Sequence, residues 1–311
     1  MMRRSPLKPI IPVLLVIFAT LPLYGSSYLL TFMLILFMYT ILAESYDIVG
    51  GYLGYINMGH SSFFGIGAYS FGLLLNSGLG LTPSFLLTAM IVAIFAVLIS
   101  YPFFRLRGAY FSLATFGLIK LLELLAFNLK GITGGSEGLT VASGYRIIPA
   151  YYMAFILCLA TIYTVHRISK SKFGLALVSI REDEEVARAF GINTYRYKTI
   201  ALITSSVFAG LMGGIYIWNI IFINPTAVFG LEIALVPIAM ALLGGTGVVI
   251  GPIVGAIFIT LVEEFLWTKV PYLHLAVYGM VIAFVGLFLP GGLMRMQKLK
   301  NLLNKLGWKE E

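Results

Sequence analysis

The sequence predicts an all-α, polytopic helical integral membrane protein. Three observations support this class: hydrophobic residues make up 59% of the 311-residue chain, charged residues make up only 11%, and the apolar residues form long runs. A bilayer core takes about 20 apolar residues per helix, and a soluble protein needs far more charge on its surface. Strands of a membrane barrel would alternate apolar and polar residues, whereas runs such as Tyr28–Ala43 and Phe85–Phe104 do not.

We expect about ten transmembrane spans, within a range of eight to ten. They are Ile10–Tyr24, Tyr28–Ala43, Ser61–Leu79, Ser84–Phe104, Gly108–Asn128, Ile148–His166, Thr199–Ile221, Leu231–Leu243, Val248–Leu266 and Tyr272–Leu289. The third span is rich in glycine and the eighth is short, so either could be broken or re-entrant.

The basic residues predict the orientation, because Lys and Arg collect in cytoplasmic loops. With ten spans, most of the 21 Lys and Arg residues fall on one side, which also receives both termini. We therefore expect both termini in the cytoplasm, a single transmembrane domain over residues 1–290 with a cytoplasmic loop at 167–198, and a basic cytoplasmic tail over 291–311. The net charge of +8 is explained by this topology, so we expect a lipid environment and no nucleic-acid partner.

The sequence predicts no covalent chemistry on this chain. The only cysteine, Cys158, lies in an apolar run, and the three histidines are far apart, so neither a metal site nor a nucleophile with its base is indicated. The glycine-rich stretch Gly244–Gly247 lacks the Gly-Lys-Ser/Thr that a phosphate-binding loop requires. We therefore expect no catalytic residues, no metal and no ATPase site.

The most informative segment is the charged island from Arg181 to Lys198. Its residues Asp183 to Gly191 carry the signals of a short helix: acidic residues in the first turn, Arg188 in the last turn, and a glycine where a helix commonly ends. Glu184 and Arg188 form an i,i+4 pair in the favourable order. Two turns are too short to be stable alone in water, so we expect this helix to lie against a partner surface. A solvated helical connector is the alternative interpretation of the segment.

Several stretches resemble, in order, the motifs of one transporter family. They are Gly54–Tyr69, Arg105–Phe111, Thr133–Leu139, Ser179–Glu185 followed by Gly191–Asn193 and Tyr197–Lys198, and Leu243–Ala256. They resemble the permease subunits of the branched-chain (hydrophobic) amino acid ATP-binding-cassette (ABC) importers, of the LivM-like type, and cover roughly residues 41–289. The chain departs from the family pattern at Asn57, where serine is common, and at Leu118, where an acidic residue is common.

The resemblance implies a multi-pass protein of the bacterial or archaeal plasma (inner) membrane that imports branched-chain or other hydrophobic amino acids. Its implied partners are a second homologous permease in a heterodimer, two ATPase subunits that use ATP and magnesium, and an extracytoplasmic solute-binding protein. The implied ATPase-coupling residues are Arg181, Asp183, Glu184, Glu185, Ala187, Phe190 and Gly191. A urea or short-amide ABC permease is the alternative, and an ion-coupled secondary transporter or a non-transporting scaffold are more distant ones.

Two groups of polar residues are candidates for the translocation path. One group stands before and at the start of the third span, and the other forms the expected external loop; they are Asn57, His60, Ser61 and Ser62, and Thr133, Gly134, Gly135, Ser136 and Glu137. Polar groups at membrane depth are costly and face protein or a water-filled path. Hydrogen bonding between helices is therefore the alternative for the first group, and a plain turn is the alternative for the second.

Overall fold

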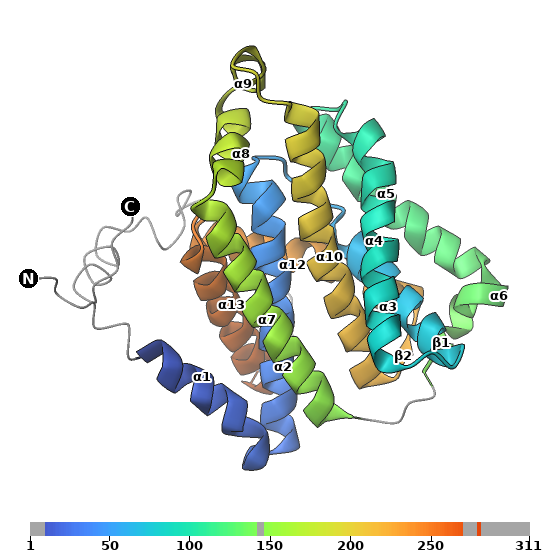
Figure 1. Ribbon diagram of the computed structural model, residues 1–311. Helices are drawn as coiled ribbons and strands as arrows, with labels where there is room; N and C mark the ends of the chain where they lie inside the picture. The colour runs from blue at the N-terminus through green and yellow to red at the C-terminus, as the bar shows by residue number, and fades with distance from the viewer. Residues whose placement is uncertain (1–9, 142–145, 270–278, 281–311) are drawn as a thin grey trace, which may run out of the picture.

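The computed structural model describes residues 10–141, 146–269 and 279–280, and within them the chain is a bundle of helices (Figure 1). The longer helices are α1 (Ile10–Thr20), α2 (Ser27–Asp47), α3 (His60–Asn76), α4 (Leu81–Phe103), α5 (Ala109–Asn128), α7 (Ile147–Ser169), α10 (Thr194–Ile220), α12 (Leu231–Gly244) and α13 (Ile250–Lys269). The shorter helices are α6 (Lys130–Thr133), α8 (Lys172–Glu182), α9 (Glu184–Ala189) and α11 (Pro225–Val228), with 3₁₀ turns at Leu21–Leu23 and Gly135–Glu137 and a π-helical extension of α2 at Ile48–Tyr52.

The helical membrane class agrees with this architecture. Among the described residues, six segments are long and apolar enough to cross a membrane: Ser27–Tyr52, Leu81–Phe103, Ala109–Asn128, Ile147–Ser169, Thr194–Ile220 and Pro225–Gly244. Every span that we expected before Lys269 coincides with a helix, while the expected span Tyr272–Leu289 and the basic tail lie outside the described residues. The count of ten, the side of each terminus and the division into domain and tail therefore stay predictions.

The centre of the bundle is α10, which packs against α2, α3, α4 and α7. Glycines allow α3 and α10 to cross closely, as small residues do between membrane helices. A Cβ atom at Gly67 would collide with the backbone of Gly210, and one at Gly213 would collide with the backbone of Phe64. The α3–α10 contact therefore depends on backbone-to-backbone approach.

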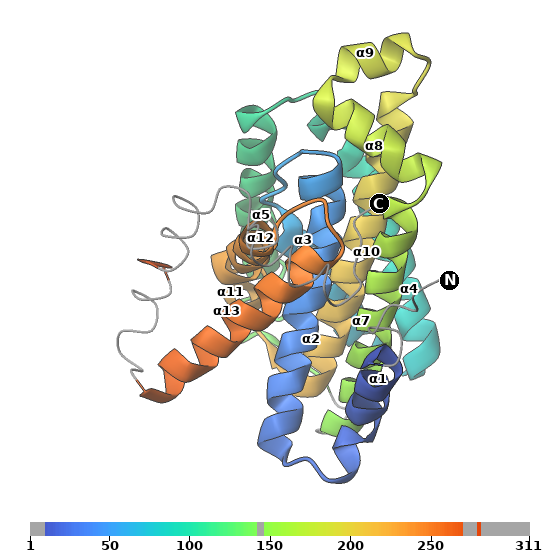
Figure 2. The ribbon, with the colours of Figure 1, turned by 90° about the vertical axis from the view of Figure 1, so that its left-hand side faces the viewer.

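The bundle has two distinct ends, which we call the α9 end and the β end. The α9 end carries α8, α9 and the connection between α12 and α13, while the β end carries a two-stranded antiparallel sheet (Figures 1 and 2). In this sheet β1 (Leu139–Thr140) pairs with β2 (Phe222–Ile223). The amide of Asn76, at the end of α3, donates to the carbonyl of Thr140 at 2.8 Å. The helix α3 thus ends at the β end.

Two segments depart from the sequence expectation. The short helix α11, which ends at Val228, is not among the expected elements; the eighth span that follows it is the continuous helix α12, which begins at Leu231. The segment 167–198, expected as a loop with one short helix, also contains α8 and the first residues of α10. The apolar face of α8 explains this helix, because Leu177 and Ile180 are buried against the bundle.

Candidate functional site

The helix α9 has the local structure that its sequence predicts. The carboxylate of Asp183 caps its N-terminus by accepting hydrogen bonds from the amides of Glu185 at 2.8 Å and Val186 at 3.0 Å. Such a cap satisfies two of the free amides of the first turn. At the other end Gly191 has a φ of +86°, the left-handed conformation that favours glycine. The chain therefore starts and stops this helix within about two turns.

Glu184 connects α9 to the membrane helices. Its Oε2 atom lies 2.6 Å from the Nζ atom of Lys198 on α10 and accepts a hydrogen bond from the hydroxyl of Tyr55 at 3.0 Å. Its Oε1 atom pairs with Arg188 at 3.1 Å, and Arg107 lies 3.9 Å from Oε2. We call these five residues, Tyr55, Arg107, Glu184, Arg188 and Lys198, the Glu184 cluster. It joins α9 to α10, to the segment between α2 and α3, and to the connection before α5.

The centre of the Glu184 cluster is withdrawn from water. Lys198 is only 2% exposed, and its ammonium also bonds the hydroxyl of Tyr55 at 2.6 Å and lies 4.6 Å from the centre of that ring. The ring of Tyr55 packs edge-on against Phe104 and Phe111. A buried ammonium is costly unless it is paired, so Glu184 and Tyr55 are the groups that make this burial possible.

Ionisation of the cluster follows from these contacts. Burial pushes the pKa of Glu184 upward, but the hydrogen bond and charge of Lys198, with the hydroxyls of Tyr55 and Thr194, outweigh it and hold the pKa below its usual value. Burial, followed by the charge of Glu184, raises the pKa of the Tyr55 hydroxyl. The cluster therefore contains a carboxylate and a neutral phenol at neutral pH.

A second connection runs from α8 into the bundle. The guanidinium of Arg181 donates to the carbonyl of Gly51 at 2.9 Å. The carboxylate of Asp47, which is fully buried at the end of α2, accepts the amide of Gly247 at 2.9 and 3.0 Å. Gly247 lies between α12 and α13 and also faces Arg181. The α9 end thus links α8, α2 and the α12–α13 connection through polar contacts.

The remaining expected coupling residues divide into buried and exposed groups. Ala187 is buried, whereas Glu185 is exposed and pairs with Arg107 at 3.3 Å. Phe190 is 84% exposed, and the space around Gly191 is open. A large aromatic side chain in this exposed position is typical of a protein-protein contact.

The first group of candidate path residues lies inside the protein. Asn57, His60, Ser61 and Ser62 are all buried. The ring nitrogen Nε2 of His60 lies 3.0 Å from the hydroxyl of Ser45 on α2, which is a contact between helices. The interpretation of this group as path lining stays a prediction.

The second group lies far from the first. It surrounds the turn from α6 to β1 at the β end, whereas His60 begins α3 toward the α9 end. Thr133 is buried and its hydroxyl donates to the carbonyl of Ala126 at 2.5 Å, while Gly134 and Gly135 have positive φ values of 75° and 58°. Ser136 and Glu137 are exposed. The structure does not bring the two groups together.

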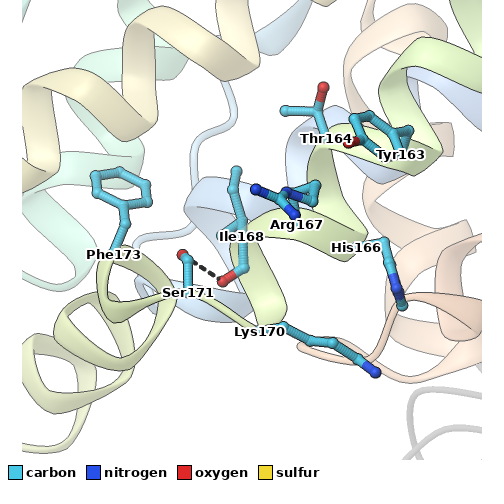
Figure 3. A pocket seen from close by; sticks show the side chains of 8 residues that line it. All are labelled: Tyr163, Thr164, His166, Arg167, Ile168, Lys170, Ser171 and Phe173. Atoms are coloured by element: carbon cyan, nitrogen blue, oxygen red, sulfur yellow. Dashed lines mark hydrogen bonds between the residues drawn. The ribbon is translucent and has the colours of Figure 1, made fainter.

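Two hollows lie near the α9 end. One, of about 740 Å³, lies at the elbow between α7 and α8 and is lined by Tyr163, Thr164, His166, Arg167, Ile168, Lys170, Ser171 and Phe173 (Figure 3). The other, of about 520 Å³, lies between the segment before α3 and the start of α5, and is lined by Gly54, Tyr55, Ile56, Met58, Gly108, Ala109, Ser112 and Leu113. The second hollow shares Tyr55 with the Glu184 cluster, so a movement of Tyr55 changes its wall.

The fold and this site define a class: a polytopic α-helical membrane subunit with a short capped helix projecting from one end. The chain belongs to the family described as branched-chain amino acid transport system / permease component, whose model matches residues 28–286. It is therefore an ABC-type permease subunit, a transport component rather than an enzyme.

Three relatives match this chain over at least two thirds of its length. It is 28% identical to the high-affinity branched-chain amino acid transport system permease protein LivM of Escherichia coli, over 85% of this chain and 70% of that protein. It is 27% identical to LivM of Salmonella typhimurium, over 84% and 68%. It is 29% identical to the autoinducer 2 import system permease protein LsrC of Yersinia pestis, over 68% and 62%. No solved structure matches the chain.

The sequence predicts α9 but not most of the residues that connect the α9 end to the membrane helices. Tyr55, Arg107 and Lys198 lie within the recognised motifs, yet no role follows from the sequence alone, and Asp47 was not singled out. Asp47 carried a usable signal, since it is an acid at the end of an apolar span. Lys198 carried a weaker one, because a basic residue at a span boundary normally reports topology.

Proposed function

We propose that this chain is the permease subunit of an ABC importer that moves branched-chain or other hydrophobic amino acids across the plasma (inner) membrane of a bacterium or archaeon. The α9 end faces the cytoplasm in this proposal and receives the ATPase subunits. The observation that carries it is the Glu184 cluster, because it fastens the projecting helix α9 to Lys198 of α10 and to Tyr55 beside α3.

In this mechanism the chain transmits a displacement from the ATPase subunits to the membrane helices. Two ATPase subunits bind ATP and magnesium, and their closure displaces α9 through the contact at Phe190. Glu184 then transmits the displacement to α10 and to the segment before α3, and Arg181 transmits it to the end of α2. Because α10 packs on α2, α3, α4 and α7, its movement changes the bundle as a whole. The expected coupling residues are the seven named above.

The other partners follow from the same proposal. A second, homologous permease completes the path, and an extracytoplasmic binding protein delivers the solute at the β end, where Thr133 to Glu137 lie. Asn57, His60, Ser61 and Ser62 lie toward the inner part of the path or support its wall. The chain itself holds no cofactor in this account.

The relatives also favour a second candidate solute. LivM proteins are named for branched-chain amino acids, while the LsrC relative is named for autoinducer 2. Urea and short amides, the third alternative, carry no charged group, whereas a branched-chain amino acid carries both an ammonium and a carboxylate. Uptake assays with these solutes in one vesicle preparation separate the candidates.

The test is ATP-dependent uptake of labelled leucine by vesicles that contain the complete transporter. We expect uptake to require ATP on the side of the membrane where the ATPase subunits lie. Uptake should be lost on deletion of Glu184–Ala189, and also in Gly191→Trp, which fills the open space beside α9. Uptake of leucine without the ATPases, or driven by an ion gradient alone, would refute the proposal.

A further inference from the structure

An ion pair lies near the middle of α5, on a surface that this chain leaves uncovered. The Nζ atom of Lys120 is 2.7 Å from the Oε2 atom of Glu123, and the Lys120 side chain is 51% exposed. In α7, α10 and α12, by contrast, the exposed charged side chains of the described residues lie within one turn of a helix end. A charged pair at this depth faces protein or a water-filled path rather than lipid.

The surroundings of the pair combine apolar side chains with free space. Leu113 and Leu124 lie on the same side of α5 as Lys120, and Leu121 borders it; all three are largely exposed. Gly117 lies one turn before Lys120, and a Cβ atom added there would meet nothing within 4 Å. This side of α5 therefore offers an apolar surface with one positive and one negative group at its centre.

The surface continues into the hollow at the α9 end. Ala109, Ser112 and Leu113 line that hollow together with Tyr55. From Leu113 the same side of the helix leads to Gly117 and Lys120 at intervals of about one turn. The ion pair and the Glu184 cluster thus lie along one continuous surface, which movement of Tyr55 can reach.

We propose that Lys120 and Glu123 form a site for the charged groups of a zwitterionic α-amino acid in the translocation path. The ammonium of Lys120 receives the solute carboxylate, the carboxylate of Glu123 receives the solute ammonium, and the leucine side chains receive an apolar solute side chain. The two residues pair with each other when no solute is present, so no charge is left alone in either state. This inference rests on the proposed function and adds the residues that bind its solute.

The site predicts a specific selectivity. A solute with both charges replaces both halves of the ion pair, whereas a solute with a single charge leaves one protein charge without a partner at low dielectric. An uncharged solute such as urea cannot replace either half. The pair therefore favours zwitterions over urea and over simple carboxylates.

The first experiment measures water access. In a Cys158→Ser background, Gly117→Cys is compared with Ile94→Cys, an exposed apolar position near the middle of α4. In the complete reconstituted transporter, a membrane-impermeant methanethiosulfonate reagent should label Gly117→Cys faster, and leucine supplied with the binding protein should slow the labelling. Equal labelling of the two positions, or no effect of leucine, overturns the site.

The second experiment measures transport. Lys120→Met and Glu123→Gln should each lower the leucine uptake rate at least about tenfold, because each leaves a single charge unpaired, and the double variant should stay low. The exchanged variant Lys120→Glu with Glu123→Lys should recover much of the uptake. Hydrolysis of ATP by each purified complex shows that the variant has folded and assembled.

The outcomes separate the site from the proposed function. If the original transporter shows no ATP-driven leucine uptake, the proposed function fails. If it imports leucine and the double variant imports leucine equally well, Lys120 and Glu123 only compensate each other's charge on the outer surface of the bundle. The proposed site is then refuted, while the proposed function stands.

Discussion

Glu184 and Lys198 lie 2.6 Å apart, at the first residue of α9 and the fifth residue of α10. The contact joins a helix that projects from the bundle to the helix at the bundle centre. The lysine is almost completely buried, so the pair is screened less than a surface ion pair. It gives the α9 end a fixed mechanical connection to the membrane helices.

Removing the negative charge of this pair should destabilise the α9 end. Glu184→Gln leaves the Lys198 ammonium buried beside neutral groups alone, the glutamine amide and the Tyr55 hydroxyl. We expect the free energy of unfolding to fall by about 2–3 kcal/mol. This is less than the cost of breaking a fully buried ion pair, because the Glu184 side chain is 13% exposed. Thermal unfolding in detergent measures it. Glu185→Gln is the control, because its side chain is 77% exposed and should change stability by less than about 0.5 kcal/mol. Equal effects would contradict the buried-pair interpretation.

The same pair predicts the dependence of stability on pH. The pKa of Glu184 is depressed in the folded state, so its contribution is present above the unfolded pKa of about 4.3 and is lost as pH falls through the folded pKa. The stability difference between the original protein and Glu184→Gln should therefore stay constant from about pH 6 to 8 and shrink below about pH 4. Unfolding at a series of pH values measures this. A difference that disappears near neutral pH would contradict the assigned pKa direction.

The hydroxyl of Tyr55 should matter more for coupling than for folding. Tyr55→Phe keeps the packing on Phe104 and Phe111 but removes the bonds to Glu184 and Lys198. We expect a loss of stability of about 1 kcal/mol and a fall in leucine imported per ATP hydrolysed. Tyr110→Phe serves as the control, since Tyr110 is 74% exposed. An unchanged ratio in Tyr55→Phe would show that the hydroxyl transmits nothing.

Asp47 should stabilise the connection between α12 and α13. Asp47→Ala leaves the amide of Gly247 without its acceptor and should cost about 1–3 kcal/mol. Asp47→Asn keeps one carbonyl oxygen and should cost less. Thermal unfolding of both variants gives the order, and an equal or larger loss in the asparagine variant would show that charge rather than hydrogen bonding is the main contribution.

The part of the site that the sequence predicts is local in the chain. The turn at Gly191 and the pair of Glu184 with Arg188 are found where the sequence places them. Asp183, expected in the first turn, lies one residue before the helix and caps it. The partners of Glu184 are different. Tyr55 is 129 residues away, and only the folded bundle brings it to α9.

The extent of the helices also shows what the sequence can predict. Apolar runs locate the spans because the membrane requires them. The helix α8 was missed because it is short and carries charged residues, although Leu177 and Ile180 show helical spacing. The meeting of Asp47 with Gly247 depends on packing of α2 against α12 and α13, which no local pattern reports.

The most direct test of the coupling account is the effect of a charge at the exposed tip of α9. Phe190→Asp changes a side chain that is 84% exposed in the permease alone, so the folded permease should keep its thermal stability. The control is Ile132→Asp, at an exposed apolar position of the β end. We predict that Phe190→Asp, unlike Ile132→Asp, loses copurifying ATPase subunits and ATP-driven uptake together. A Phe190→Asp transporter that retains its ATPases and imports leucine at the original rate would contradict the account.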